Sequence, residues 1–399
     1  MLVFWFFVLL IVMCLIGYVL GRRKAVAASG GELSSLHSLL SYHGWNVALS
    51  TFLSGTTVIV IWAFISSLIG ALPTLIGVII AVLAAVAAFG YSYGRIDRDF
   101  RARNFVEGLI KGLLIFASSI AILTTVAIVF SMLFETARFF NDYPWQSFFF
   151  GTNWAPNFRG NSDLGMLPLL WGTLYVSFIA LLVAVPIGLF AAIYLSEYAS
   201  PKLRAFAKPM IEVLAGIPTI VYGLFALITV GPMLRDYFAQ PLGLGDSSSS
   251  VMTAGIVMGV MLIPFVSSLS DDIINAVPQS MRDGSLGLGA TSSETIRQVV
   301  VPAALPGIVG AVLLAASRAI GETMIVVMGA GAAARLSLNP FEAMTTVTVK
   351  IVSQLTGDTD FASPETLVAF ALGITLFVFT LGLNVLALYI VRKYREQYE

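Results

Sequence analysis

The stretch LPLLWGTLYVSFIALLVAVPIGLFAAIY, residues 167–194, decides the fold class. It contains no charged side chain. As an α-helix rising 1.5 Å per residue, it is long enough to cross a hydrocarbon core about 30 Å thick. A segment that crosses lipid must satisfy its own backbone hydrogen bonds, which a helix does. The stretch therefore predicts a transmembrane helix.

Similar apolar runs recur along the chain, which has 399 residues, 58% of them hydrophobic and only 11% charged. A soluble domain has about a quarter of its residues charged. We therefore predict an all-α membrane protein with nine spans. The predicted spans are residues 2–20, 47–69, 71–91, 108–134, 167–194, 210–230, 251–270, 305–331 and 366–391.

The sequence lacks the residue patterns of several other protein classes. Cys14 is the only cysteine, which excludes an internal disulfide and a CxxC metal site. His37 and His43 do not form an HExxH motif, and no GxxxxGK[ST] loop for ATP phosphates is present. We expect no metal, no cofactor and no nucleic-acid partner.

The distribution of positive charge predicts the topology. The start MLVFWFF has no basic residue, whereas GRRK follows the first span, so we expect an uncleaved anchor with its N-terminus outside. Most of the 22 basic residues then fall in loops on one side, which the positive-inside rule assigns to the cytoplasm, together with the C-terminus. The cluster RIDRDFRAR, residues 95–103, fits either a topology determinant or a site for anionic membrane lipid.

The loop SDDIINAVPQSMRDGSLGLGATSSETIRQVVVPAALPG, residues 270–307, is the most informative cytoplasmic segment. Its first part has amphipathic helical spacing, and a second helix is expected to begin with Ser292 or Ser293 as N-cap, after a glycine-rich break. Two interpretations remain open, a docking element for another protein and an amphipathic loop lying on lipid. The apolar positions of the first part are Ile273, Ile274, Val277 and Met281.

The same loop resembles the EAA loop of ABC importer permeases. The family pattern has an acid and two small residues, then three residues and a glycine, then nine residues and an apolar stretch that ends in proline. The matching residues are Asp283, Gly284, Ser285, Gly289, Val299, Val301 and Pro302. Asp-Gly-Ser stands where the family has Glu-Ala-Ala, which keeps the acid and the small size. The resemblance implies an ATPase coupling loop at about residues 270–305.

The resemblance extends over most of residues 108–399. The stretches FFFGTNWAPN, EVLAGIPTIVYGLFAL, MLIPFVSSLSDDIINAVP and SRAIGETMIVVMGAG are similar to the PstC-type permease subunits of phosphate ABC importers. This implies a type I ABC importer permease core of six transmembrane helices at 108–399. Residues 1–107 are then an N-terminal extension with about three transmembrane helices and basic cytoplasmic loops.

The resemblance also implies a set of partners in the bacterial cytoplasmic membrane. They are a PstA-like permease subunit, two ATP-binding cassette ATPase subunits and a periplasmic phosphate-binding protein. In this scheme the chain is not an enzyme. ATP-driven closure of the ATPases moves the coupling loop, the spans alternate between inward-open and outward-open states, and phosphate passes between the two permease subunits.

Arg318 and Glu322 are the outstanding charges inside a predicted span, where a charge costs about 2.5–3.5 kcal/mol to insert. They are four residues apart, so we expect them to share one helix face and to pair. Ala311, Ala315 and Ala319 form a small-residue ladder that favours close packing of a neighbouring helix. Either Arg318 attracts a dianionic substrate while Glu322 holds it, or the pair is a buried structural lock.

Thr219 is a weaker candidate for the substrate pathway. Gly216 and Pro218 are expected to break the sixth span, and the break either presents Thr219 to a cavity or is a kink that aids packing. Three other functions remain as alternatives to phosphate import. They are import of another oxyanion (sulfate or molybdate), a membrane-embedded enzyme, and a stand-alone channel, against which the ATPase-docking loop argues.

Overall fold

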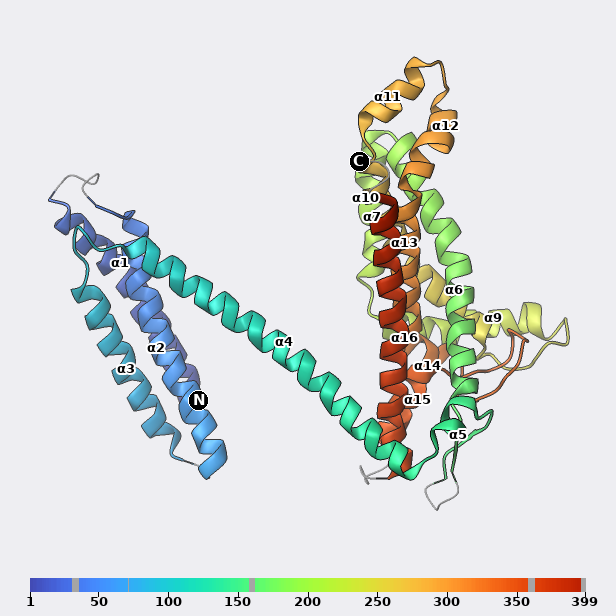
Figure 1. Ribbon diagram of the computed structural model, residues 1–399, viewed down its shortest axis with the longest axis horizontal. Helices are drawn as coiled ribbons and strands as arrows, with labels where there is room; N and C mark the ends of the chain where they lie inside the picture. The colour runs from blue at the N-terminus through green and yellow to red at the C-terminus, as the bar shows by residue number, and fades with distance from the viewer. Residues whose placement is uncertain (31–35, 71, 158–161, 358–362, 396–399) are drawn as a thin grey trace. The chain divides into compact units, whose positions relative to one another are not determined.

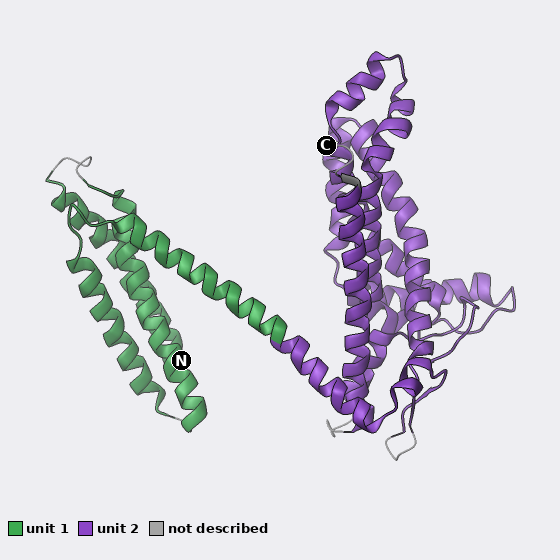
Figure 2. Cartoon of the chain, viewed as in Figure 1, with its two compact units in different colours: residues 1–126 green, residues 127–399 purple. Residues whose placement is uncertain are grey.

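The computed structural model describes residues 1–30, 36–70, 72–157, 162–357 and 363–395. Within this part, nine helices are long and apolar enough to cross a membrane, which confirms the all-α membrane fold (Figure 1). One short antiparallel pair, β1 (Trp154–Ala155) with β2 (Asp163–Leu164), accompanies them. The chain forms two compact units, residues 1–126 and 127–399, coloured separately in Figure 2.

The first unit packs three helices, α1 (Leu2–Ala28), α2 (Leu40–Ile69) and α3 (Thr74–Gly94), around a small apolar core. Basic side chains close the ends of two of them. Lys24 Nζ donates to the carbonyl of Tyr93 at 2.6 Å, and Arg98 Nε donates to the carbonyl of Ala28 at 2.6 Å. These bonds satisfy carbonyl groups that have no partner within their own helix. The core residues are Phe6, Leu10, Ile59, Ala81 and Ala85.

Helix α4 (Ala102–Asp142) contributes to both units, which divide between Val126 and Ala127. Its 41 residues form one uninterrupted helix because no proline or pair of helix-breaking residues falls inside the run. The division of the chain into an extension at 1–107 and a permease core at 108–399 remains a prediction.

The second unit is built around two closely packed helices, α6 (Leu167–Ile193) and α10 (Val251–Asn275). Gly259 shows how close they are, because a Cβ there would lie 2.7 Å from Cβ of Val183 and 2.9 Å from the carbonyl of Ala180. Helices α13 (Val301–Ile320) and α14 (Met324–Gly329) complete this core, and Met258, Leu262 and Ile325 are fully buried in it.

The remaining helices of the second unit surround this core. Helix α16 (Pro364–Arg395) packs against α13 and against α15 (Val347–Gly357). Near α5 (Trp145–Phe150), Phe139 and Phe148 are buried with aromatic neighbours and with Leu372 of α16. Figure 1 shows α5 at one end of the unit and α11 (Gln279–Gly287) with α12 (Ser292–Thr295) at the other.

The structure corrects two predicted spans. Residues 210–218 belong to α7 (Pro201–Ala215) and to the break that follows it, so the sixth crossing segment runs instead from Thr219 to Ala239. It consists of α8 (Thr219–Phe225), η3 (Ala226–Val230), α9 (Gly231–Leu234) and η4 (Arg235–Ala239), the two η segments being π-helical. The eighth span, predicted at 305–331, is a helical segment from Ser292 to Ile320, and α14 is separate from it.

Candidate functional site

The alanine ladder of α13 faces the interior, as the sequence predicted. Ala311, Ala315 and Ala319 are each at most 3% exposed, and α13 packs against α6, α10 and α16. The helix ends at Ile320, with Gly321 as its C-cap. The end of α13 therefore falls between Arg318 and Glu322.

This helix end makes the predicted pairing of Arg318 with Glu322 wrong. Arg318 lies in the last turn of α13, whereas Glu322 lies in the connection to α14, so the two residues do not share a helix face. Among the described side chains, the ion pairs within 4.0 Å do not include this one. The expectation failed because four-residue spacing brings side chains together only while the helix continues.

Glu322 instead binds the first turn of α14. Its Oε1 accepts hydrogen bonds from the amides of Met324, at 3.0 Å, and Ile325, at 3.4 Å. Its backbone carbonyl accepts a bond of 2.8 Å from the hydroxyl of Thr348 in α15. A carboxylate at the start of a helix is stabilised by the free amide groups there. Glu322 therefore holds α13, α14 and α15 in a fixed arrangement.

Arg318 has no carboxylate partner among the described residues, and it is exposed to solvent in the isolated subunit. Its guanidinium lies over the ring of Phe265 in α10, 5.7 Å from the ring centroid. A cation over an aromatic face keeps its full positive charge. The charge of Arg318 is thus available to an anion or to a neighbouring subunit.

Thr219 lies at a break in the chain, as predicted, and begins α8 directly after Pro218. The side chain of Tyr222 fixes the break, because its hydroxyl donates to the carbonyl of Leu214 in α7 at 2.8 Å. Helix α8 packs against α14, which follows Glu322. The structure thus brings the helix of Thr219 beside the helix that Glu322 caps, while Thr219 itself is half-buried.

Helices α11 and α12 form a hairpin, residues 279–295, and this corrects the predicted amphipathic helix. Ile273 and Ile274 belong to α10, the chain turns at Ala276–Pro278, and Met281 belongs to α11. These side chains nevertheless meet in one cluster with residues of α6 and α13. The cluster comprises Ala192, Ile274, Val277, Val300, Ala304 and Ile308, with Ile273 and Met281 at its edge.

The small residues of the EAA-like pattern lie inside α11. Asp283 is exposed and accepts from Gln279 Nε2 at 3.0 Å. Ser285 bonds to Thr295 of α12 through their hydroxyl groups, 2.9 Å apart, and so joins the two arms of the hairpin. Gly284 faces open space. The triplet therefore gives α11 an exposed acid at Asp283 and an open surface at Gly284, while Ser285 links the two arms of the hairpin.

The tip of the hairpin is formed by Leu288 and Gly289. Gly289 has a φ of +89°, a conformation that side chains other than glycine rarely adopt, so it allows the sharp turn. Leu288 is 92% exposed, which leaves a large apolar side chain at the apex. Sequence reasoning missed Leu288, although its place next to the pattern glycine was a usable signal.

The N-cap of α12 is Thr291, and the prediction of Ser292 or Ser293 was wrong. Thr291 accepts from the amide of Glu294, and Glu294 accepts from the amide of Thr291 at 2.8 Å, which is a capping box. The helical segment continues through η5 (Ile296–Val300) into α13, where Pro302 occupies the first turn. Pro302 thus lies inside a continuous helical segment, directly after the π-helical turn η5, where the regular hydrogen-bond ladder of the helix is already interrupted.

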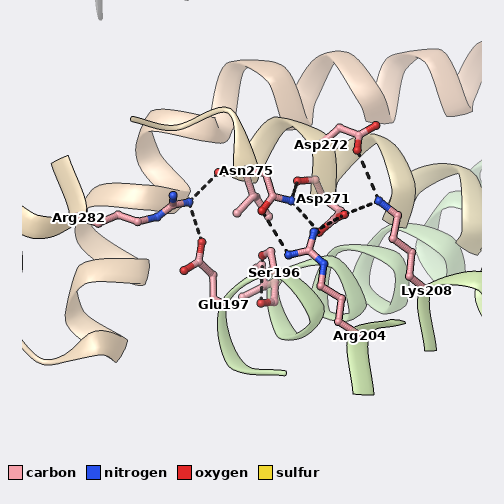
Figure 3. A network of polar contacts seen from close by, with 10 residues as sticks. Ser196, Glu197, Arg204, Lys208, Asp271, Asp272, Asn275 and Arg282 are labelled. Atoms are coloured by element: carbon pink, nitrogen blue, oxygen red, sulfur yellow. Dashed lines mark hydrogen bonds and ion pairs between the residues drawn. The ribbon is translucent and has the colours of Figure 1, made fainter. Parts of the chain in front are cut away.

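A buried carboxylate, which the sequence did not reveal, joins α7 to α10 (Figure 3). The side chain of Asp271 is 3% exposed and accepts from Arg204 at 2.9 Å and from Lys208 at 2.8 Å. Asn275 also donates to it at 3.0 Å. The hydrogen bond from Lys208 to Asp271 is the main cause that raises the pKa of Lys208. The network fixes α7 on the end of α10 nearest the hairpin.

Comparison with known families identifies two regions of the chain. A family model described as a binding-protein-dependent transport system inner membrane component matches residues 184–396. This range includes the hairpin, α13 and the segment after it. A second model, described as a phosphate ATP-binding cassette transporter, matches residues 7–76 in the first unit.

Two curated relatives align with this chain over most of their own length. The phosphate transport system permease protein PstC of Xylella fastidiosa is 32% identical over 324 residues, covering 76% of this chain and 95% of that protein. The probable ABC transporter permease protein YqgH of Bacillus subtilis is 35% identical over 226 residues, covering 57% of this chain and 71% of that protein.

A solved structure supports the fold. It is the bacterial alginate ABC transporter in complex with an alginate pentasaccharide-bound periplasmic protein. One of its chains matches with a TM-score of 0.50 and 14% identity, covering 72% of this chain and 97% of that chain. At this identity the likeness concerns the fold alone.

Proposed function

The chain belongs to the family of binding-protein-dependent transport system inner membrane components, and from this we propose its activity. It is a multi-pass permease subunit, PstC type, of an ATP-driven phosphate importer in the bacterial cytoplasmic membrane. It does not catalyse a reaction itself. ATP hydrolysis belongs to separate subunits, and this chain provides part of the path that phosphate takes across the membrane.

One observation carries the mechanical part of this proposal. A single helical segment, Ser292–Ile320, connects the hairpin to Arg318. From Ser292 to Arg318 it rises about 39 Å. Movement of the hairpin is therefore passed along one continuous helical segment to Arg318, as coupling between a cytoplasmic loop and a span requires.

The hairpin has the features of a docking element. Its apex is the 92% exposed Leu288, and a large apolar side chain at such a place is a typical anchor for a groove on another protein. Asp283 and Gly284 leave the outer surface of α11 polar and open. We assign the groove to a cytoplasmic ATPase, so the hairpin lies on the cytoplasmic side of the membrane. In this proposed topology the C-terminus is also cytoplasmic and the N-terminus lies outside.

The anion path follows from charge. Arg318 has no carboxylate partner among the described residues, and a guanidinium offers forked donors that fit phosphate oxygens. Glu322 holds the segment that follows α13 through its bonds to α14. We propose that Arg318 attracts phosphate at the interface with a PstA-like permease subunit, and that Glu322 and Thr219 shape the path beside it.

Transport by the complete assembly tests this function. The chain is reconstituted in liposomes with the second permease and two ATPase subunits, with ATP inside and the phosphate-binding protein outside. We expect ATP-dependent uptake of labelled phosphate that unlabelled sulfate and molybdate do not displace. Uptake of labelled sulfate or molybdate in place of phosphate would overturn the substrate assignment.

The apex residue provides a second test of the same proposal. Leu288→Asp removes the apolar anchor without entering any packed core, so it should abolish co-purification of the ATPase subunits while the permease still folds. Arg138→Gln alters an exposed side chain outside the hairpin and serves as the control. Normal ATPase association of the Leu288→Asp variant would show that the hairpin apex is not the docking site.

A further inference from the structure

Arg282 extends from α11 to two other elements of the second unit (Figure 3). Its Nη2 donates to Oε1 of Glu197 in η2 (Tyr194–Tyr198), at 2.8 Å, and to the carbonyl of Ile274 in α10, also at 2.8 Å. Its Nη1 donates to the carbonyl of Val277 at 3.2 Å. One guanidinium thus binds the hairpin to the ends of two spans.

The contact is partly shielded from water. The side chains of Arg282 and Glu197 are only 15% and 14% exposed, unlike the exposed pair of Arg138 and Glu135, at 51% and 24%. A charge-assisted hydrogen bond gains strength where water is excluded, and removal of one partner then leaves the other charge uncompensated. The Arg282–Glu197 pair is therefore expected to hold firmly, whereas an exposed pair contributes little.

The rest of α11 has few other bonds of this kind. None of its residues is fully buried, Gln279 and Asp283 bond to each other, and Ser285 bonds to the other arm of the hairpin. Among the described contacts of α11, the side chain of Arg282 supplies the polar link to η2 and α10. Met281 adds an apolar contact to the cluster beneath.

The elements that Arg282 joins to the hairpin, η2 and α10, belong to two candidate membrane spans. Glu197 lies one residue before the end of a continuous helical segment, Leu167–Tyr198, which continues α6. The end of α10 is in turn clamped to α7 by Asp271. A displacement of α11 therefore reaches α6 through Glu197 and α10 through the carbonyl of Ile274, separately from the path through α13.

We propose that Arg282 is a positioning residue that couples the hairpin to α6 and α10, so that movement of the hairpin drives those two spans as well as α13. This proposal rests on the transport function proposed above. It assigns to Arg282 and Glu197 a role in converting ATP hydrolysis into transport, beyond the docking of an ATPase.

The ratio of phosphate transported to ATP hydrolysed tests the coupling in the reconstituted complex. In Arg282→Gln and Glu197→Gln we expect this ratio to fall about tenfold, the effect of losing roughly 1.4 kcal/mol of coupling, while ATP hydrolysis continues. Arg282→Lys should give a similar loss because an ammonium group cannot make the forked contact. The matched control Arg138→Gln, which breaks the exposed pair, should keep the wild-type ratio.

Two outcomes of the ratio measurement overturn the proposal. One is a wild-type ratio in both Arg282→Gln and Glu197→Gln. The other is that both variants fail to assemble, or lose ATP hydrolysis and transport to the same extent, while Arg138→Gln behaves like the wild type. That result would mean that the Arg282–Glu197 pair serves folding and not coupling. If Arg282→Gln alone fails to assemble, Glu197→Gln decides the test, because it leaves the bonds from Arg282 to the carbonyls of Ile274 and Val277 in place.

A distance measurement tests the coupling independently of the transported solute. Spin labels are placed at Gly287→Cys, where a side chain meets open space, and at Tyr194→Cys, in a chain whose native thiol is removed by Cys14→Ser. With Arg282 present, the distance should stay the same in the nucleotide-free and ATP-bound complexes, whereas Arg282→Gln should broaden or shift it. An equal change with Arg282 present overturns the proposal. Absence of phosphate uptake by the wild type would instead overturn the proposed function.

Discussion

Arg318 lies with its guanidinium 5.7 Å from the centroid of the Phe265 ring, and this contact joins α13 to α10 without neutralising the cation. Glu322, which the sequence places four residues later, is engaged with the amides of α14. The two charges therefore have separate tasks. Each of them can be removed without leaving the other as half of a broken ion pair.

The independence of the two charges leads to the first prediction. In a double-mutant cycle of Arg318→Gln and Glu322→Gln, the effects on the free energy of unfolding should add to within about 0.5 kcal/mol. A buried ion pair would instead give a coupling energy of about 1 kcal/mol or more. Thermal unfolding of the four proteins in detergent measures the cycle, and a coupling of that size would contradict the separation seen here.

Gly284 carries the second prediction. It lies within α11 with open space around its Cα, so Gly284→Ala should stabilise the hairpin by about 0.5–1 kcal/mol through the better helix propensity of alanine. Gly289→Ala, at a φ of +89°, should instead destabilise it by about 1 kcal/mol. Melting temperatures of the two variants measure these opposite effects.

The Gly284→Ala variant is also expected to bind the ATPase subunits as the wild type does. Because the alanine adds only a methyl group to an open surface, association with the ATPase subunits should be unchanged. A loss of association without a loss of permease stability would mean that the partner approaches the backbone of α11 at Gly284 too closely for a Cβ.

Asp271 carries the third prediction. Asp271→Asn removes the negative charge between Arg204 and Lys208 while keeping the size of the side chain. We expect a loss of about 1–3 kcal/mol in stability, since a nearly buried group loses charge-assisted bonds and two cations lose their shared counter-ion. Asp272→Asn is the matched control, because Asp272 is 69% exposed and 3.7 Å from Lys208. Equal melting temperatures for both variants would contradict this assignment.

Lys208 supplies the fourth prediction, on pH. Its hydrogen bond to Asp271 raises the pKa of Lys208 above the ordinary lysine value, about 10.4, so its stabilising effect is complete below that pH and is lost as the pH rises through the raised value. Lys208→Met should therefore lower the melting temperature equally at pH 7 and pH 9. The difference from wild type should shrink only above pH 10.

The exposed Lys202 on the same helix is the control for this experiment, and Lys202→Met should change the melting temperature little at any of these pH values. A difference between wild type and Lys208→Met that already disappears between pH 7 and pH 9 would show that the ion pair with Asp271 does not raise the pKa of Lys208.

Most of the spans, and the helix–glycine–helix order of the hairpin, could be predicted from sequence because their signals are local. Residues 167–194 are apolar throughout, and glycines separate the two arms of the hairpin. The capping box of Thr291 and Glu294 was equally local, since TSSE has the spacing of that motif. The prediction of Ser292 or Ser293 overlooked this spacing; serine is as good an N-cap as threonine, so only the acid three residues later distinguishes Thr291.

The contacts that hold the site together were beyond sequence reasoning. Arg282 and Glu197 are 85 residues apart, and their meeting depends on how α6, α10 and α11 pack. The end of α13 at Ile320 was hidden because the apolar run continues into α14. Glu322 caps that second helix only once α14 has turned away from α13, which an amino-acid pattern does not reveal.

The length of α4 has a consequence for the membrane itself. Residues 112–134 of this helix carry no charge and rise about 35 Å, somewhat more than a hydrocarbon core of about 30 Å. Lys111 and Glu135 mark the two ends of that uncharged stretch. A long hydrophobic stretch is accommodated in a thinner bilayer by tilting, by kinking or by local thickening of the bilayer. We therefore expect the tilt of α4 to change with bilayer thickness.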